Sequence, residues 1–246
     1  MTLYQSATAF DAVIVDLDGN MVDTMGDFVA ALNLMLAELP AIDSGAIVKP
    51  QITHAVVERI VGKGSEHLIK SVLNELLAQS KRAPNAINSI AFDPGLLFNT
   101  AFASYQRHYN IINGQHSQVY PGVLEGLQGF QGAGLKLACL TNKPLAFAQS
   151  LLRVKGLNAF FAEVFGGDSF ERKKPDPLPI LKTCEALGTR PDRTLVIGDS
   201  SNDAEAARAA GCPVVMVTYG YNHGEPVRRV DADGFVDSLA ELQWQM

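Results

Sequence analysis

Four aspartates follow two short apolar runs of the sequence, and their spacing suggests a site for a cation. Asp16 ends the first run and Asp18 comes two residues later, while Asp199 ends another run and Asp203 lies about one helical turn beyond it. If the two runs are neighbouring parallel strands, their carboxyl ends meet at the sheet edge where open α/β sheets bind ligands. Clustered carboxylates repel one another unless a cation neutralises them, and oxygen ligands without nearby Cys or His favour Mg²⁺ over zinc. The pattern predicts a magnesium site.

Two further segments carry groups that suit a phosphoryl group. Thr141 and Asn142 end a third apolar run, and Lys174 stands directly before Pro175. A hydroxyl, backbone amides and a lysine opposite a metal-bound carboxylate are what the oxygens of a transferring phosphoryl group require. Aspartates also serve as helix caps and turn residues, which is the competing interpretation. The presence of all four segments together favours phosphoryl transfer.

The elements that position these residues follow from the apolar pattern. Continuous short apolar runs predict strands buried on both faces, as in a parallel sheet, over residues 12–16, 135–141, 194–199 and 214–217. Residues 202–210 are rich in helix formers, and Gly211 and Pro213 stop that helix just before the last of these strands. A strand, a helix and a strand in this order imply a right-handed crossover.

The stretch between Asp18 and the run at residues 135–141 has helical rather than strand periodicity. Apolar residues recur there every three or four positions, at Phe28, Val29, Leu32, Met35, Leu36 and Leu39 and again at Leu68, Ile69, Val72, Leu73, Leu76 and Leu77. Segments 40–50, 82–94 and 110–121 carry helix-breaking residues and are predicted as loops.

The predicted fold class is therefore α/β, a doubly wound parallel sheet (Rossmann-like) core with an inserted α-helical cap domain. The core is assigned to residues 1–20 and 121–246 and the cap to residues 21–120, with hinges near residues 20–24 and 118–121.

Composition narrows the class of protein. The chain has 246 residues, of which 47% are hydrophobic and 19% charged, so it can bury a sizeable core and is not intrinsically disordered. Its net charge of −6 disfavours nucleic acid as a partner. Neither a signal peptide nor an apolar run long enough for a membrane span is found. Three widely spaced cysteines indicate buried apolar side chains in a reducing compartment. We expect a cytoplasmic protein, monomeric or homodimeric, that binds a small phosphorylated metabolite.

The sequence resembles the haloacid dehalogenase-like hydrolases. The resemblance follows the order of that family's motifs along nearly the whole chain, in Asp16-Leu17-Asp18-Gly19, Thr141-Asn142, Lys174-Pro175-Asp176-Pro177 and Gly198-Asp199-Ser200-Ser201-Asn202-Asp203. Within the family it is most similar to the phosphoglycolate phosphatases, through Tyr120-Pro121-Gly122-Val123, Thr141-Asn142-Lys143-Pro144, Gly166-Gly167-Asp168, Ala210-Gly211-Cys212-Pro213 and Tyr219-Gly220-Tyr221.

The resemblance implies a Mg²⁺-dependent phosphatase with an aspartyl-phosphate intermediate and 2-phosphoglycolate as the expected substrate. In that scheme Asp16 is the nucleophile, and Asp18 protonates the leaving alkoxide and then activates water. The metal ligands are the Asp16 side chain, the Asp18 main-chain carbonyl and Asp199, supported by Asp203 from outside the coordination sphere. The transferring phosphoryl group is bound by Thr141, the Asn142 amide and Lys174.

One residue departs from the family pattern, and three cap residues suggest a substrate loop. Asn20 stands where the family usually has Thr, and we expect its side chain to bond locally to the backbone. The segment Gly62-Lys63-Gly64 resembles the family's specificity loop, where Lys63 would meet a substrate carboxylate; a solvated turn is the alternative. Arg107-His108 is a second candidate for that task.

Two other functions fit part of the pattern. A β-phosphoglucomutase-like phosphotransferase would use the same pair of aspartates but return the phosphoryl group to a sugar. A non-enzymatic phospho-receiver also combines acids, a Thr and a Lys around an aspartyl-phosphate. Asp18, two residues after the nucleophile, and the long insert argue against the receiver.

Overall fold

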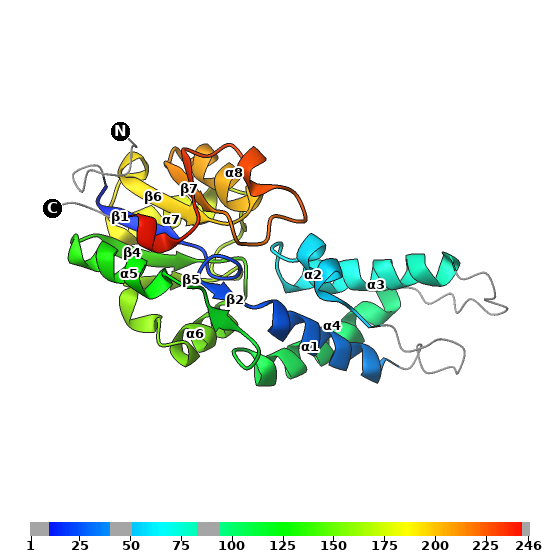
Figure 1. The fold of residues 1–246 in the computed structure, drawn as a ribbon. Helices are drawn as coiled ribbons and strands as arrows, with labels where there is room; N and C mark the ends of the chain where they lie inside the picture. Colours follow the sequence, from blue (N-terminus) through cyan, green and yellow to red (C-terminus); the bar gives the residue numbers. More distant parts are fainter. Residues whose placement is uncertain (1–9, 40–50, 83–93, 243–246) are drawn as a thin grey trace.

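The computed structural model describes residues 10–39, 51–82 and 94–242. Figure 1 shows a sheet flanked by helices and, beside its edge, a second group of helices.

The described strands of the main sheet are all parallel and have the order β5-β4-β1-β6-β7-β8. Their bounds are β1 Ala12–Val15, β4 Lys136–Leu140, β5 Glu163–Phe165, β6 Thr194–Gly198, β7 Val214–Val217 and β8 Gly234–Val236. β1 lies between β4 and β6, and Val15 is in register with Cys139 on one side and Ile197 on the other. The residues that follow these three strands therefore meet at one edge.

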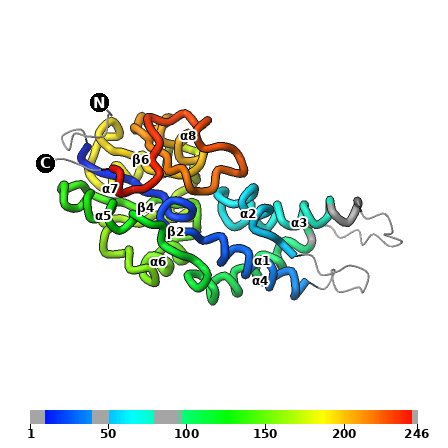
Figure 2. The backbone as a smooth tube through the Cα atoms, viewed as in Figure 1, coloured from blue at the N-terminus to red at the C-terminus, as the bar shows by residue number. Residues whose placement is uncertain are grey.

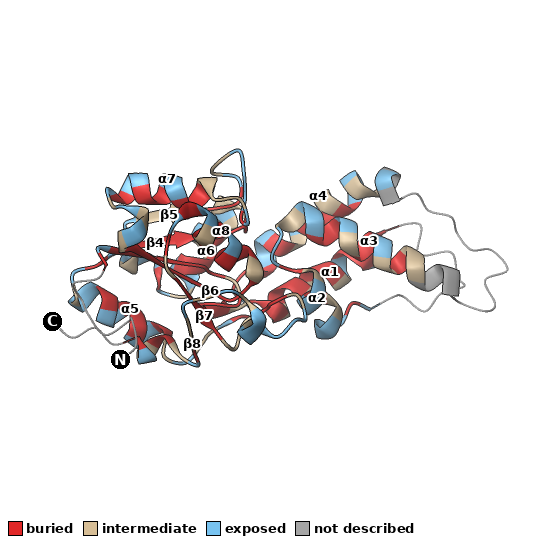
Figure 3. Ribbon diagram, turned by 90° about the horizontal axis from the view of Figure 1, so that it is seen from above, coloured by how far each residue is buried: buried red, intermediate tan, exposed pale blue. Residues whose placement is uncertain are grey.

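Helices cover both faces of the sheet. Val13 and Val15 pack with buried residues of α5 (Val123–Gly132) and α6 (Leu145–Val154). Ala12 and Ile14 face the other way, toward α7 (Leu178–Leu187) and α8 (Ser201–Ala210). Figure 3 shows these helices with buried faces toward the sheet and exposed faces outward. The predicted doubly wound fold class is confirmed.

The helices of the second group share a hydrophobic cluster of their own. They are α1 Met25–Glu38, α2 His54–Ile60, α3 Ser65–Arg82 and α4 Pro94–Ile112. The buried residues of the predicted helical pattern, from Phe28 to Leu76, all belong to this cluster. We call α1–α4 the cap helices. Tyr221, which is far from these helices in the sequence, also enters their cluster.

Two short strands connect the cap helices to the sheet. β2 (Val22–Asp23) pairs antiparallel with β3 (Gln118–Val119), so the outgoing and returning chains run side by side (Figure 2). The predicted loop over 110–121 was partly wrong, because its first residues complete α4 and two others form β3. Two residues are too few for a strand periodicity to show in the sequence. The predicted loop 40–50 lies outside the described residues, as does most of 82–94.

The four predicted strands were confirmed to within one or two residues, but β5 and β8 were missed. Both are three residues long, lie at the sheet's two edges and are mostly half-buried, so neither carries a continuous apolar run. All three cysteines are buried and free. Among the described residues, no helix combines the length and apolar character that a membrane span requires.

Candidate active site

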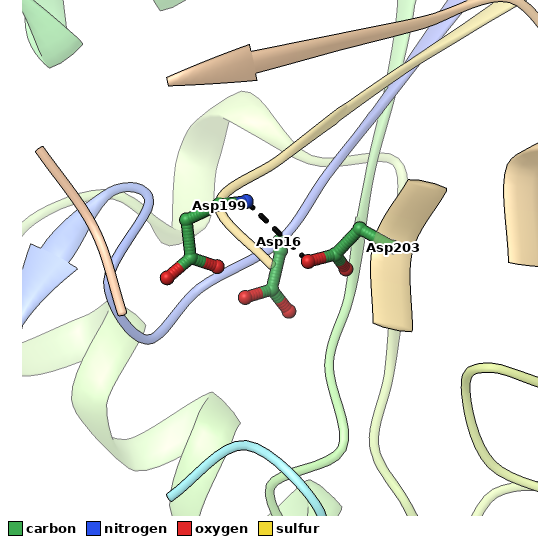
Figure 4. Close-up of side chains that lie close together, drawn as sticks. All are labelled: Asp16, Asp199 and Asp203. Carbon is green, nitrogen blue, oxygen red and sulfur yellow. Dashed lines mark hydrogen bonds between the residues drawn. The ribbon is translucent and has the colours of Figure 1, made fainter. Parts of the chain in front are cut away.

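Three carboxylates gather where β1 and β6 end. Asp16 follows β1, Asp199 follows β6 and Asp203 lies in the first turn of α8, and their oxygen atoms lie within 4.8 Å of one another (Figure 4). All three residues are buried. Burial and the neighbouring aspartates raise the pKa of Asp199 well above its usual range. The cluster arises because β1 and β6 are adjacent and in register, and it contains three of the four aspartates that the sequence pattern predicted.

Lys174 supplies one positive charge to this cluster. Its Nζ lies 2.7 Å from Asp16 Oδ1 and 2.6 Å from Asp203 Oδ1, and it also donates to the carbonyl oxygen of Leu140 at 2.7 Å. Burial raises the pKa of Asp16 to about 7, although the Lys174 charge opposes that shift. Lys174 therefore orients the Asp16 carboxylate, and the buried anions in turn raise the pKa of the lysine despite its burial.

Asp203 holds the loop after β6 in place. Its Oδ2 accepts hydrogen bonds from the backbone nitrogens of Asp199 (3.3 Å) and Ser200 (3.1 Å) and from the Ser200 hydroxyl (2.9 Å). Figure 4 shows the first of these contacts. This carboxylate caps the start of α8 and also accepts from Lys174, so its oxygens are largely occupied by protein donors.

The Asp18 carboxylate is not one of the three clustered carboxylates and is held by other partners. Lys143 Nζ lies 2.7 Å from its Oδ1 and 2.9 Å from its Oδ2, and the Thr24 hydroxyl donates to Oδ1 at 2.8 Å. Asp18 still lines the same pocket as Asp16. An ion pair and a hydroxyl thus fix its carboxylate beside the nucleophile candidate.

Lys143 was not assigned a role from the sequence. Its side chain is 2% exposed, and its Nζ lies 4.8 Å from the ring centroid of Phe28 and 5.0 Å from that of Tyr109, both on cap helices. The available signal was its position directly after Thr141 and Asn142, at the end of a central strand. Thr24 gave no comparable signal, because it is a single hydroxyl at the start of a helix.

Asn142 ties three parts of the site together. Its side chain donates to the carbonyl oxygen of Lys174 at 2.8 Å and accepts from the Lys174 backbone nitrogen at 3.0 Å. The same amide nitrogen donates to the carbonyl oxygen of Gly62 at 2.9 Å. Thr141 lines the pocket with it, and its hydroxyl accepts from the Lys143 backbone nitrogen at 3.2 Å.

The predicted substrate loop is placed only partly in the pocket. Gly62 and Gly64 line it, whereas Lys63 is exposed and is not part of the pocket wall. The turn between α2 and α3 contacts the core through the Gly62 carbonyl, which accepts from Asn142. Arg107 and His108 pair with Glu38, and neither lines the pocket.

The expectation for Asn20 was wrong. Asn20 is fully buried, and neither the oxygen nor the nitrogen of its side chain has a hydrogen-bond partner. The loop is held by other contacts, among them the bond from the Tyr219 hydroxyl to the Asn20 carbonyl at 2.9 Å. The loop therefore keeps its course without the local bond that we expected.

A glycine lets this loop approach the metal-ligand candidate. Gly19 has φ +83°, and a Cβ there would lie 2.1 Å from Asp199 Oδ2. Asp199 Oδ2 also accepts from the Tyr221 backbone nitrogen at 2.6 Å. Tyr221 was quoted in the sequence only as part of a loop match, yet its hydroxyl accepts from the backbone nitrogen of Thr24 at 2.9 Å.

Comparison with known proteins identifies the family. A model of haloacid dehalogenase-like hydrolases matches residues 13–217. The chain belongs to this hydrolase family. It is 43% identical to a phosphoglycolate phosphatase of Thiobacillus denitrificans over 94% of this chain and 92% of that protein. It is 40% identical to one of Nitrosospira multiformis, over 94% and 92% of the two chains.

Solved structures agree with this assignment to the haloacid dehalogenase-like hydrolases. The crystal structure of a predicted phosphoglycolate phosphatase from Haemophilus somnus superposes with a TM-score of 0.83, at 29% identity over 95% of this chain and 96% of that one. The family and the similarity to these relatives show that this chain is a phosphatase, an enzyme that hydrolyses phosphoric monoesters.

Phosphatases of the haloacid dehalogenase-like family generally use a divalent metal ion, and the donor set here fits one. The three clustered carboxylates supply only oxygen ligands, and Lys174 balances one of their negative charges. Asp18 and Lys143 balance each other. The remaining charge of two is that of a divalent cation, which would also remove the repulsion that raises the Asp199 pKa.

Proposed function

We propose that this chain is a Mg²⁺-dependent phosphatase of 2-phosphoglycolate that forms an aspartyl-phosphate on Asp16. The observation that carries the proposal is the buried group at the sheet edge, in which the Asp16 carboxylate lies 2.7 Å from Lys174 Nζ beside Asp199 and Asp203. A carboxylate nucleophile, a lysine and an all-oxygen metal site are the parts that phosphoryl transfer through an acyl phosphate needs.

The choice of substrate rests on the relatives and on the size of the pocket. The proteins at 43% and 40% identity carry the name phosphoglycolate phosphatase, and each is covered over 92% of its length. The pocket has a cavity volume of about 40 Å³. One water molecule needs roughly 10–15 Å³ of such a cavity, so this volume favours a ligand of few atoms.

In the proposed reaction Asp16 attacks the phosphorus atom, and the bond to the ester oxygen breaks. Asp18 gives its proton to the departing alkoxide and then takes a proton from a water molecule, which attacks the phosphorus of the acyl phosphate and releases inorganic phosphate and the Asp16 carboxylate. Thr141, the Asn142 amide and Lys174 are proposed to hold the phosphoryl oxygens. The contact between Lys143 and Asp18 supports a fixed position for the proton carrier.

The Asp16 side chain, the Asp18 carbonyl oxygen and Asp199 would hold the Mg²⁺, with Asp203 supporting the loop behind them. Bound there, the ion would stabilise the negative charge that develops on the transferring phosphoryl group. The donor set supports Mg²⁺ because it contains hard oxygen atoms and no described Cys or His.

Residues 21–120 are proposed to act as a cap that excludes water, with β2 and β3 as its hinge. Supporting this, the pocket wall combines residues of α1, α3 and α4 with residues that follow β1, β4 and β6. A cytoplasmic location and a monomeric or homodimeric state belong to the same proposal.

Phosphate release from a panel of small esters tests the proposed function. With Mg²⁺ present, we expect the highest kcat/KM for 2-phosphoglycolate, at least about tenfold above hexose phosphates and simple alkyl phosphates. Asp16→Asn should abolish turnover, and Asp18→Asn should accumulate a phosphorylated protein. A preference for a hexose phosphate, or phosphoryl return to a sugar in a mutase assay with a bisphosphorylated sugar, would contradict the substrate proposal.

A further inference from the structure

A substrate with a second anionic group needs a second cation inside the pocket. The phosphoryl end of the pocket already has Lys174, which contacts Asp16 and Asp203. Among the described residues that line the pocket, Lys143 is the other cation. Lys63, expected from the sequence to meet a carboxylate, is exposed and outside the pocket wall. Burying a carboxylate without a charged or hydrogen-bonding partner is strongly unfavourable.

Two tyrosines next to Lys143 have buried hydroxyls that lack partners. Tyr105 and Tyr109 of α4 are 0% and 1% exposed, and neither hydroxyl has a hydrogen-bond partner in the structure. Both residues line the pocket, and their rings stack with centroids 5.3 Å apart. A buried hydroxyl without a partner destabilises a fold, so two of them on residues that line one pocket indicate that a ligand supplies the acceptor.

Lys143 has the capacity to join these hydroxyls around a ligand. An ammonium group carries three N–H donors, and the two contacts with Asp18 use two of them. Its Nζ lies 5.0 Å from the Tyr109 ring centroid, on the cap side of Asp18. Burial raises the pKa of both tyrosines, so both hydroxyls remain protonated donors at any working pH. The remaining wall on this side is mostly apolar, with Phe28, Val61 and Leu68, and the nearby Asp18 carboxylate is paired with Lys143.

We infer that Lys143, Tyr105 and Tyr109 form the subsite that binds the carboxylate of the substrate and so select 2-phosphoglycolate over neutral phosphate esters. This inference rests on the proposed function and adds to it the residues that determine specificity. The ammonium group offsets the carboxylate charge, and the two hydroxyls donate to its oxygens. Without substrate, the Lys143 ammonium group pairs with Asp18 alone. When a carboxylate binds, the ammonium group interacts with both anions.

Removal of the hydroxyls alone tests the subsite. Tyr105→Phe, Tyr109→Phe and the double variant are compared with the wild type on 2-phosphoglycolate and on 2-hydroxyethyl phosphate, which lacks the carboxylate but is close in size. We expect the ratio of kcat/KM for the two esters to fall roughly tenfold to hundredfold in each single variant, the loss typical of one hydrogen bond to a charged group. Activity on the neutral ester should stay within about threefold of wild type. The melting temperature should stay equal or rise, because an unpaired buried group is removed.

Tyr219→Phe is the matched control. Its hydroxyl donates to the Asn20 carbonyl at 2.9 Å, and the residue is not part of the pocket wall. This variant should lower the melting temperature and leave the ratio unchanged, the opposite of the result for the α4 tyrosines.

The outcomes separate this inference from the proposed function. If the wild type prefers 2-phosphoglycolate and both single variants keep that preference, the subsite is wrong and the function stands. Equal losses on both esters would also overturn the subsite, since they indicate a structural role. A wild type without preference for the carboxylate overturns both the subsite and the substrate, whereas the phosphatase activity survives.

Discussion

The side-chain amide of Asn142 donates a hydrogen bond of 2.9 Å to the carbonyl oxygen of Gly62 and so joins the proposed phosphoryl site of the core to the cap helices. Asn202 adds a second, longer bond of 3.3 Å to the same oxygen. Because the Asn142 side chain also bonds to the Lys174 backbone, the turn between α2 and α3 is linked through one residue to the proposed phosphoryl site. The position of this turn should therefore affect turnover.

Gly62→Ala is expected to displace the turn and lower kcat/KM roughly tenfold. Gly62 has φ +103°, and a Cβ there would lie 3.0 Å from His223 Cε1, so the strain of about 1–3 kcal/mol must be relieved by a shift of the turn. Gly129→Ala is the control, because that residue lies in α5 with no atom within 4 Å of a new Cβ. The control should gain about 0.5–1 kcal/mol of stability and keep its activity. An unchanged kcat/KM for Gly62→Ala would show that this turn does not control turnover.

Lys174→Met should reduce kcat by about a thousandfold or more. The variant leaves the buried carboxylates of Asp16 and Asp203 without their cation, and breaking a buried ion pair from one side typically costs about 3–5 kcal/mol of stability. Denaturant titration of the metal-free protein measures this cost. Adding Asp203→Asn should restore part of the stability but none of the activity, because Asp16 still lacks its partner. Full stability in the single variant would contradict the proposed balance of charges.

Divalent metal should stabilise the protein more at pH 8 than at pH 5.5. Burial raises the pKa of Asp16 to about 7 from 3.8, so without metal the native state holds a proton that the unfolded chain has lost, and stability falls as pH rises between these values. A bound cation favours the ionised carboxylates and removes that loss. At Mg²⁺ a hundredfold above its dissociation constant we expect a gain of about 2.7 kcal/mol, roughly 5–10 °C in melting temperature. A larger stabilisation by Mg²⁺ at pH 5.5 than at pH 8 would contradict the proposed metal site. Asp199→Asn should weaken the stabilisation by Mg²⁺ at both pH values.

Asn20→Thr should stabilise the protein and alter turnover by less than about tenfold. The buried side-chain amide of Asn20 has no hydrogen-bond partner. Threonine is smaller and has one hydroxyl, so it leaves fewer polar groups unpaired, and we expect the free energy of unfolding to rise by about 1 kcal/mol. Thermal unfolding and steady-state kinetics check both effects. A gain in turnover above about a thousandfold, equal to about 4 kcal/mol of barrier, would instead mean that Asn20 impairs the natural site.

The sequence by itself determined the core fold and the principal side chains at its edge. Continuous apolar runs identified β1, β4, β6 and β7, and the residues directly after them had to meet because parallel strands place their carboxyl ends together. Asp16 and Asp199 follow from this local order, since a strand's end fixes where the next residue lies, whereas Lys174 was identified from its position directly before Pro175. The short edge strands β5 and β8 were not predictable, because three half-buried residues leave no pattern.

Only the tertiary structure decided which groups face the pocket from the cap. Lys63 was the expected cation on the basis of its flanking glycines, whereas the turn exposes it and Lys143 is the buried one. The hydroxyls of Tyr105 and Tyr109 look in sequence like any residues of an apolar helical stripe. Their relation to Lys143 depends on how α4 packs over the loop after β4, a contact between residues far apart in the chain. Sequence periodicity records which face of a helix is buried, but not which atoms that face meets.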